Sequence, residues 1–283
     1  MHLVIRVFGR FCPALLFGFL AASNIAHADE DVLGYAYGSE TLPKGHSEVV
    51  QWITARTDKG AGRYRATDFY TEFEHGVTDR LQTSLYLTAE RFAIHGVSGL
   101  DDRQTARFSG IRFSVEYALR NPDRDGYGLS LYLEPEYAAL DDVSGARRDE
   151  FGLEGKVIFQ KEWLDGALLY LANLVVEPEQ AREAGETARE LGAEFSHGLS
   201  RRITPQWYVG IENRWRSEFE PWQLAHATAY AGYLGPALHF ESGRWWITLA
   251  WSRQVTDWPA TSHGLSLGEY EKNDFRLKTG VEF

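Results

Sequence analysis

The sequence predicts an all-β chain that closes into an antiparallel up-and-down transmembrane β-barrel of about twelve strands. Three observations predict this fold: strict alternation of apolar and polar residues, the lack of an apolar run long enough for a membrane helix, and connections that alternate between short and long. Alternation places successive side chains on opposite faces of a strand. It is clearest in residues 274–283, where one face carries Phe275, Leu277, Thr279, Val281 and Phe283.

The first 28 residues have the features of a secretory signal peptide. Arg6 and Arg10 flank an apolar run at residues 13–22, and Ala26-His27-Ala28 is a small-x-small cleavage site. We therefore expect export, with cleavage after Ala28. No later stretch approaches the roughly 20 consecutive apolar residues that a membrane helix needs, so a membrane-embedded form of this chain has to be a barrel.

The composition of the chain limits its partners and its chemistry. Lys and Arg number 29 against 40 Asp and Glu, which gives a net charge of −11. Such an acidic surface argues against nucleic acid as a partner. The one cysteine, Cys12, lies in the predicted signal peptide. The exported chain would therefore have no disulfide, and we expect no cofactor.

The exported chain divides into a short lead and the barrel. We expect residues 29–45 to form a periplasmic N-terminal segment at the barrel mouth and residues 46–283 to form the barrel.

Two residues stand out within the expected strands. Asn173 is the one polar residue in a strand that is otherwise apolar on both faces, and Pro236 implies a bulge or local break because proline cannot donate to the ladder. The alternation predicts strands at about 46–57, 63–74, 81–90, 111–119, 129–137, 151–160, 167–176, 190–195, 207–215, 230–240, 245–252 and 274–283.

The connections between the expected strands alternate in length. Counted from a periplasmic N-terminus, the periplasmic turns at 76–80, 121–126, 164–166, 198–205 and 241–244 are mostly short, whereas the loops at 95–107, 141–150, 177–187, 217–226 and 257–270 are longer and polar. Short turns on one side and long loops on the other are typical of outer-membrane barrels. A soluble β-sandwich would show the same alternation within strands, but it does not require this asymmetry.

Large aromatic side chains near the strand ends predict two interfacial girdles. The periplasmic girdle would contain Phe73, Trp163, Phe195, Trp207 and Trp245, and the extracellular girdle Tyr64, Phe108, Phe151, Trp215 and Trp258.

The signal peptide, strand count, turn asymmetry and C-terminal Phe283 together resemble the Gram-negative outer-membrane β-barrel class over residues 46–283. This resemblance implies an outer-membrane location, contact with lipid and lipopolysaccharide, and recognition by the barrel-assembly machinery through Gly280, Val281 and Phe283. Residues 40–45 (ETLPKG), 51–52 (QW) and 74–79 (EHGVTD) also resemble the N-terminal pattern of a group of uncharacterised exported barrel proteins. That group implies no activity.

The polar face of the expected strands is rich in glutamate. These carboxylates either line an open lumen and select small cationic solutes, or pair with Arg and Lys and fill a closed interior. A barrel of twelve strands fits both interpretations. The candidate lumen-lining residues are Glu72, Glu74, Glu90, Arg112, Glu116, Glu134, Glu136, Glu154, Lys156, Glu190, Glu194, Glu212, Arg214, Arg276 and Lys278, with Glu116, Glu134 and Glu212 as the candidate selectivity residues.

Two alternatives to a porin-like small-solute channel remain open. A hydrolase at the barrel rim could use His95 with Ser98 and the acids Asp101 and Asp102, because acyl transfer needs a base beside a nucleophile. Ser262, His263 and Asp257 supply the same residue types, although ordinary polar loops do so too. A non-catalytic adhesion barrel would instead bind a partner through its loops. We expect a channel, with no enzymatic activity.

We also predict no metal site. The histidines are scattered without the spacing of ligands, and no Met or Cys remains after the predicted cleavage. The acidic pairs 101–102 and 141–142 either bind divalent cations that bridge lipopolysaccharide or are solvated loop charge.

Overall fold

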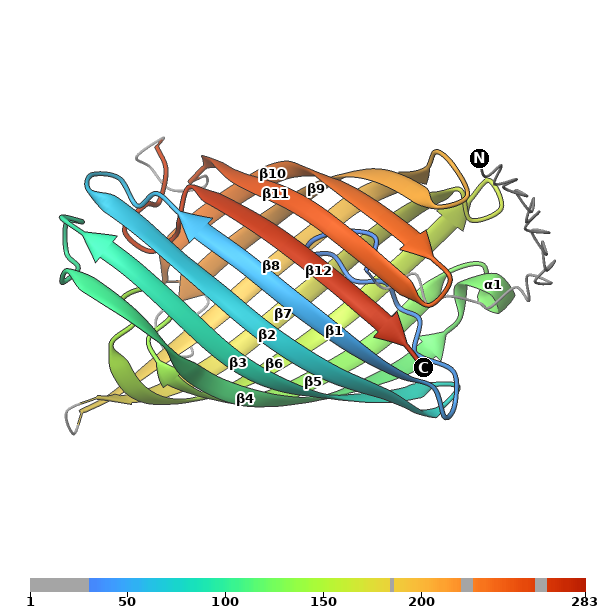
Figure 1. Cartoon of the computed structure of the whole chain (residues 1–283), viewed down its shortest axis with the longest axis horizontal. Coiled ribbons are helices and arrows are strands. Elements are labelled where there is room, and N and C mark those ends of the chain that lie inside the picture. The colour runs from blue at the N-terminus through green and yellow to red at the C-terminus, as the bar shows by residue number, and fades with distance from the viewer. Residues whose placement is uncertain (1–30, 184–185, 220–225, 258–263) are drawn as a thin grey trace, which may run out of the picture.

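The computed structural model describes residues 31–183, 186–219, 226–257 and 264–283, which form one closed β-barrel (Figure 1). The predicted signal peptide lies outside the described residues. Consecutive strands pair antiparallel, and β1 also pairs with β12, so the prediction of a twelve-stranded up-and-down barrel is confirmed. The strands are β1 (Ser47–Thr57), β2 (Arg63–Thr78), β3 (Leu81–His95), β4 (Arg103–Arg120), β5 (Gly128–Leu140), β6 (Arg147–Trp163), β7 (Leu168–Glu183), β8 (Glu186–Arg202), β9 (Trp207–Phe219), β10 (Ala227–Ser242), β11 (Trp245–Thr256) and β12 (Asn273–Glu282), and a short helix α1 (Pro122–Asp125) follows β4.

The two ends of the barrel differ in their connections. At the end that we call the turn end, on the right in Figure 1, β1 begins, β12 ends, and short turns join β2 to β3 and β10 to β11. Ser47 and Phe283 exchange two main-chain hydrogen bonds there, of 2.8 and 3.1 Å, which continue the β1–β12 ladder to its edge. The opposite end, which we call the loop end, carries the connections at 96–102, 141–146 and 257–272.

Several strands reach further toward the loop end than the alternation predicts. The predicted loop at 177–187 is wrong, because Glu177 and Glu179 belong to β7 and lie opposite Gly192 and Glu190 of β8. The ladder satisfies main-chain groups whatever the side chains are. Both faces of a strand can be polar beyond the apolar band, so the strand continues where the alternation of hydrophobicity has ended.

The outer surface of the barrel carries an apolar band. Large hydrophobic side chains on β2 to β12 are exposed, and a band of this kind on the outside of a barrel is what contact with lipid requires. Among the described residues, no helix is long and apolar enough to cross a membrane. The band includes Phe69, Leu85, Leu87, Ile111, Phe113, Leu131, Leu133, Leu153, Val157, Leu174, Val176, Val209, Ile211, Leu234, Leu249, Val255 and Phe275.

Most of the aromatic residues expected in the girdles face outward, but Tyr64 does not. It is buried with Phe92 in an apolar cluster at the loop end, and its hydroxyl donates to the Val143 carbonyl at 2.9 Å. Trp215 is half-buried, and Trp258 lies outside the described residues. The exposed members are Phe73, Trp163, Trp207 and Trp245 near the turn end and Phe108 and Phe151 toward the loop end. Phe195 is also exposed, but it lies in the middle of β8, opposite Trp215, and not in the expected periplasmic girdle.

The N-terminal residues 31–42 lie inside the barrel. Figure 1 shows this segment as a blue trace that crosses the interior behind β1 and β12. Val32 and Leu33 are at most 1% exposed and pack in one apolar cluster with Leu169, Leu171, Tyr208, Ala237 and Ala250 of the wall. The sequence placed this lead at the barrel mouth, whereas the structure places it within the bore.

Candidate functional site

The barrel wall holds residues 31–42 mainly by bonds to their main chain. Glu212 of β9 accepts the N–H groups of Tyr35 and Ala36, both at 2.7 Å. Asn173 of β7 accepts from the Tyr37 N–H at 2.6 Å and donates to the Tyr37 carbonyl at 3.1 Å. Both side chains face the interior because their strands alternate.

The same pattern continues along the segment in both directions. Gln160 and Gln82 accept the N–H groups of Ser39 and Leu42 at 2.8 and 2.6 Å. Ser130 and Thr248 donate to the carbonyls of Ser39 and Asp31, at 2.6 and 2.5 Å. Polar side chains from strands on all sides of the barrel thus satisfy main-chain groups that would otherwise be buried without partners.

Charged residues fix the two tyrosines of this segment. The guanidinium groups of Arg214 and Arg276 lie 3.8 and 3.9 Å from the Tyr35 ring centre. The Lys156 ammonium lies 4.1 Å from the Tyr37 ring centre, and Lys278 forms an ion pair with Asp31. Because cations are attracted to aromatic faces, these contacts tie the segment to β6, β9 and β12.

Above the segment, toward the loop end, lies a cavity of about 280 Å³. Tyr35 and Tyr37 contribute to its floor, and Tyr270 and Glu271, from the connection before β12, line its loop-end side. The side chain of Asp142 is 57% exposed, so the cavity rim reaches solvent. On the other side of the segment, a cavity of about 40 Å³ is lined by Ser39, Glu40 and Thr41 with residues of the turns.

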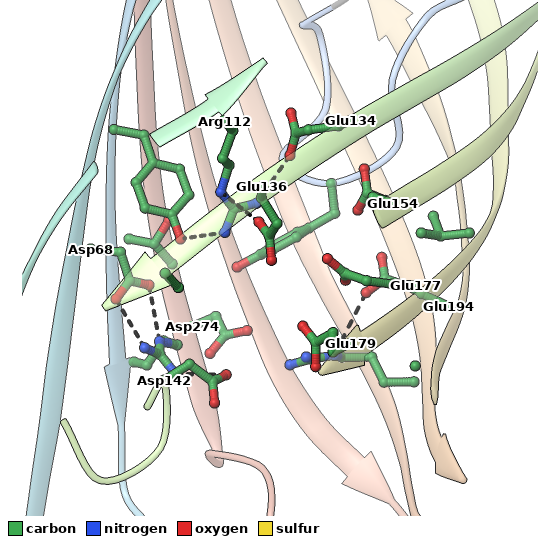
Figure 2. A pocket seen from close by; sticks show the side chains of 18 of the residues that line it. Asp68, Arg112, Glu134, Glu136, Asp142, Glu154, Glu177, Glu179, Glu194 and Asp274 are labelled. Atoms are coloured by element: carbon green, nitrogen blue, oxygen red, sulfur yellow. Dashed lines mark hydrogen bonds and ion pairs between the residues drawn. The ribbon is translucent and has the colours of Figure 1, made fainter. Parts of the chain in front are cut away.

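Among the described residues that line the larger cavity, acidic side chains outnumber basic ones, fifteen to seven. Most of the acids come from one wall, β5 to β8, and Figure 2 shows several of them facing the same space. The acids are Asp68, Glu90, Glu134, Glu136, Asp142, Glu150, Glu154, Glu177, Glu179, Glu190, Glu194, Glu218, Glu269, Glu271 and Asp274, and the bases are Arg56, Arg112, Arg148, Lys156, Arg214, Arg216 and Arg276.

The basic side chains have acidic partners or aromatic neighbours on the wall. Arg112 pairs with Glu134 and Glu136 at 3.2 and 2.9 Å and lies over the Tyr70 ring. Arg56 donates to both oxygens of Asp68, at 2.9 and 3.0 Å. Their charges are therefore largely compensated by groups of the barrel itself.

Four carboxylates on the strands that line the cavity have no such partner. Among the described residues, no ion pair or hydrogen bond is formed by Glu90, Glu177, Glu179 or Glu190, and Glu90 is only 7% exposed. Carboxylate oxygens of Glu136, Glu177 and Glu179 lie within 4.8 Å of one another. In their ionised form, carboxylates without a cationic partner in a narrow, partly desolvated space attract cations.

The charges at the loop end include one carboxylate that stays ionised in acid. Burial acts to raise the pKa of Glu271, but Arg56, with smaller contributions from a hydrogen bond to Asp274 and from Arg216, outweighs it and lowers this pKa to about 2. The two arginines lie 4.0 and 3.9 Å from its carboxylate. In the same connection, burial raises the pKa of Glu269. The connection therefore carries charge that depends on pH over a wide range.

The structure separates the fifteen candidate lumen-lining residues into two groups. Ten line the larger cavity: Glu90, Arg112, Glu134, Glu136, Glu154, Lys156, Glu190, Glu194, Arg214 and Arg276. The other five are buried nearer the turn end: Glu72, Glu74, Glu116, Glu212 and Lys278. Of the candidate selectivity residues, Glu134 alone lines the larger cavity, because Glu212 binds residues 31–42 and Glu116 lies on the turn-end part of β4.

Sequence reasoning missed two kinds of residue at this site. Glu177, Glu179 and Glu150 were placed in loops, although their two-residue spacing from neighbouring inward positions would have put them on the inner face of longer strands. The neutral residues Gln82 and Gln160 were not singled out, and Asn173 was noted only as the one polar residue of an apolar strand. No sequence pattern marks an amide side chain as a partner for a distant main-chain group.

The two candidate hydrolase sites are not assembled in the described residues. His95 Nδ1 lies 2.6 Å from Asp102 Oδ2, with both side chains more than half exposed, but Ser98 forms no hydrogen bond with His95 in the part of the chain that the structure describes. In the acidic pair 141–142, which was considered above as a cation site, Asp141 pairs with Arg148 and accepts the Ser144 N–H in its turn. Ser262 and His263 lie outside the described residues.

Solved structures share this fold at low sequence identity. The crystal structure of the COG4313 outer membrane channel from Pseudomonas putida F1 superposes with a TM-score of 0.59 at 13% identity, covering 87% of this chain and 98% of that one. The NanC porin superposes with a TM-score of 0.51 at 9% identity, covering 83% of this chain and 98% of the porin. No curated protein matches the sequence. The likeness shows the fold of an outer-membrane barrel, not a substrate. A family model does match the sequence itself over residues 25–283, and the chain belongs to that family, the family of unknown function DUF6662.

Proposed function

We propose that this protein is an outer-membrane channel for small solutes, with its loop end outside the cell and its turn end in the periplasm. The apolar band, the short turns at the end where both termini of the barrel lie, and the longer loops opposite support this orientation. Residues 1–28 would direct export and be removed after Ala28. Gly280, Val281 and Phe283 would form the assembly signal, and the Phe283 side chain is 66% exposed.

The solutes of this channel are small cations. The observation that carries this assignment is the set of unpaired carboxylates on the cavity wall, Glu90, Glu177, Glu179 and Glu190. A solute with ammonium or guanidinium groups would meet compensating charge there, whereas an anion of the same size would be repelled. Six of the seven described bases of the wall do not offset this preference because they form ion pairs with carboxylates, and the seventh, Arg276, lies over the Tyr35 and Trp52 rings.

Transport fits the interior better than catalysis does. Among the described residues, the cavity lining contains carboxylates, arginines and tyrosines, but none of the Ser, Cys or His side chains that acyl transfer uses. The His95–Asp102 pair is exposed at the rim and is not joined to Ser98 in the described structure. Lipid and lipopolysaccharide would contact the apolar band, and we propose no cofactor.

Bilayer recordings and liposome uptake test this function. The refolded chain should give currents whose reversal potential in a potassium chloride gradient favours potassium, and liposomes should take up putrescine faster than succinate. Glu177→Gln with Glu179→Gln should reduce both preferences. The matched control is Asp123→Asn with Glu186→Gln, which removes two exposed carboxylates that do not line the cavity. Currents that favour chloride, or uptake that ignores solute charge, would contradict the proposal.

A further inference from the structure

We infer that residues 31–42 are a removable plug, bound as an extended peptide in a cradle that the barrel wall provides for it. Binding of residues 31–42 by the cradle does not depend on whether the barrel is a channel. The further claim that the plug controls passage rests on the proposed channel function. Four observations carry the inference: the way the segment is held, the space made for it, its independence from the sheet, and the cavities on its two sides.

The contacts of the cradle are those of a peptide-binding site. Side chains of β3, β5, β6, β7, β9 and β11 bond to main-chain N–H and C=O groups of the segment, as the contacts of Glu212 and Asn173 show. Glu212 receives two adjacent N–H groups on one carboxylate oxygen, an arrangement in which an ionised acceptor strengthens both bonds. These side chains bind main-chain groups, so the ligand class is an extended peptide.

Glycines in the wall give the cradle its shape. A Cβ at Gly198 or Gly210 would lie 2.6 or 2.5 Å from the Leu33 side chain, and a Cβ at Gly128 would lie 1.8 Å from Ser39 Oγ. None of these three glycines has a positive φ, so the backbone does not require glycine there. A Cβ at Gly198 would also lie 2.7 Å from the Ile211 carbonyl oxygen, so the glycines that make space mainly for residues 31–42 are Gly210 and Gly128.

The segment is not part of the sheet that surrounds it. Residues 31–42 form no strand, and the ladder from β1 to β12 closes without them. Their departure would break side-chain contacts but no ladder hydrogen bond. The barrel can therefore keep its fold when the plug leaves, and loss of the plug would join the cavity of about 280 Å³ to the turn end, where the cavity of about 40 Å³ now lies.

The test cuts the plug from a barrel that has already folded. Lys44 and Gly45 are exposed, so a protease recognition sequence inserted between them is accessible after refolding of the full chain. After cleavage, conductance should rise at least tenfold. A synthetic peptide of residues 31–42 should then bind the cut barrel, as followed by fluorescence anisotropy, and should return the conductance to its value before cleavage. A peptide with Leu33→Asp should bind at least tenfold more weakly.

The outcomes separate the cradle from the channel. If the native peptide binds the cut barrel no better than the Leu33→Asp peptide, the cradle is overturned. If the peptide binds specifically but release of the segment, checked by mass spectrometry, leaves the conductance unchanged, control of passage by the plug is overturned and the cradle stands. If neither intact nor cut barrels carry current or take up solute while the peptide still binds specifically, the channel function fails and the binding site survives.

Discussion

The two halves of the lumen differ in what meets their inward-facing polar side chains. In the turn-end half, Glu212, Asn173 and Gln160 bind the main chain of residues 31–42. In the loop-end half, Glu177, Glu179 and Glu190 face the larger cavity. None of these three carboxylates has a cationic partner among the described residues. Both sets follow the same alternation, and Asn173, Glu177 and Glu179 share β7, so what opposes a polar side chain, and not its position in the pattern, decides its role.

Under the proposed channel function, this difference assigns a structural role to the turn-end half and solute selectivity to the loop-end half. A buried carboxylate that accepts two N–H groups is stabilised in place, and removing it would leave those donors unsatisfied. A carboxylate beside an open, partly desolvated space can be neutralised with little effect on the fold, but the potential in that space then changes. Substitutions in the two halves should therefore affect different measurements.

The largest effect is expected from Leu33→Asp. Burial of a leucine contributes about 1.5–3 kcal/mol, and a buried unpaired carboxylate adds a further cost, so the plug should be displaced in most molecules. Hydrogen exchange of the amides of residues 31–42 should lose its protection while the strands keep theirs. Leu33→Met, which conserves volume, should leave the protection nearly intact. Equal protection in Leu33→Asp and the native chain would show that the pocket does not hold the segment.

The next largest effect is expected from Glu212→Ala. This change leaves the N–H groups of Tyr35 and Ala36 without their acceptor, at about 1–3 kcal/mol for each buried donor. Faster exchange at these two amides is the readout, and Glu212→Gln, which keeps one acceptor oxygen, should lose less. A variant whose exchange rates match those of the native chain would remove Glu212 from the cradle.

A smaller effect on a different observable is expected from Glu177→Gln with Glu179→Gln. Loss of two carboxylates from the cavity wall should lower the potassium-to-chloride permeability ratio by about two- to threefold, since thirteen acids would still face seven bases. The exchange protection of residues 31–42 should not change. A permeability ratio equal to that of Asp123→Asn with Glu186→Gln would place the selectivity of the pore elsewhere.

The alternation of apolar and polar residues predicts the barrel well because it indicates which face of each strand belongs to the apolar outer band. It predicts the strand ends poorly, as at Glu177 and Glu179, because beyond the apolar band polar residues occupy both faces while the ladder continues. It also cannot place residues 31–42. Their contacts join positions far apart in the chain, such as Tyr35 with Glu212, and no local pattern in either stretch records the match.

The smallest expected effect is the pH dependence of the connection before β12. The pKa of Glu271 is lowered to about 2 in the folded protein, so its ionised form stabilises the fold above the ordinary glutamate range and this contribution is lost as the pH falls toward 2. Glu271→Gln should therefore lower the melting temperature at pH 6, and the difference from the native chain should shrink between pH 4 and 2. A difference that does not depend on pH would contradict the pairing of Glu271 with Arg56 and Arg216.

The plug and the selectivity of the lumen can be tested together by recording the current through one refolded barrel in a potassium chloride gradient, before and after cleavage between Lys44 and Gly45. We predict a small current that favours potassium before cleavage and at least a tenfold rise after it with the same preference, because the released plug opens a lumen whose wall carries unpaired carboxylates. An unchanged current after release of the plug, or an open current that favours chloride, would contradict this prediction.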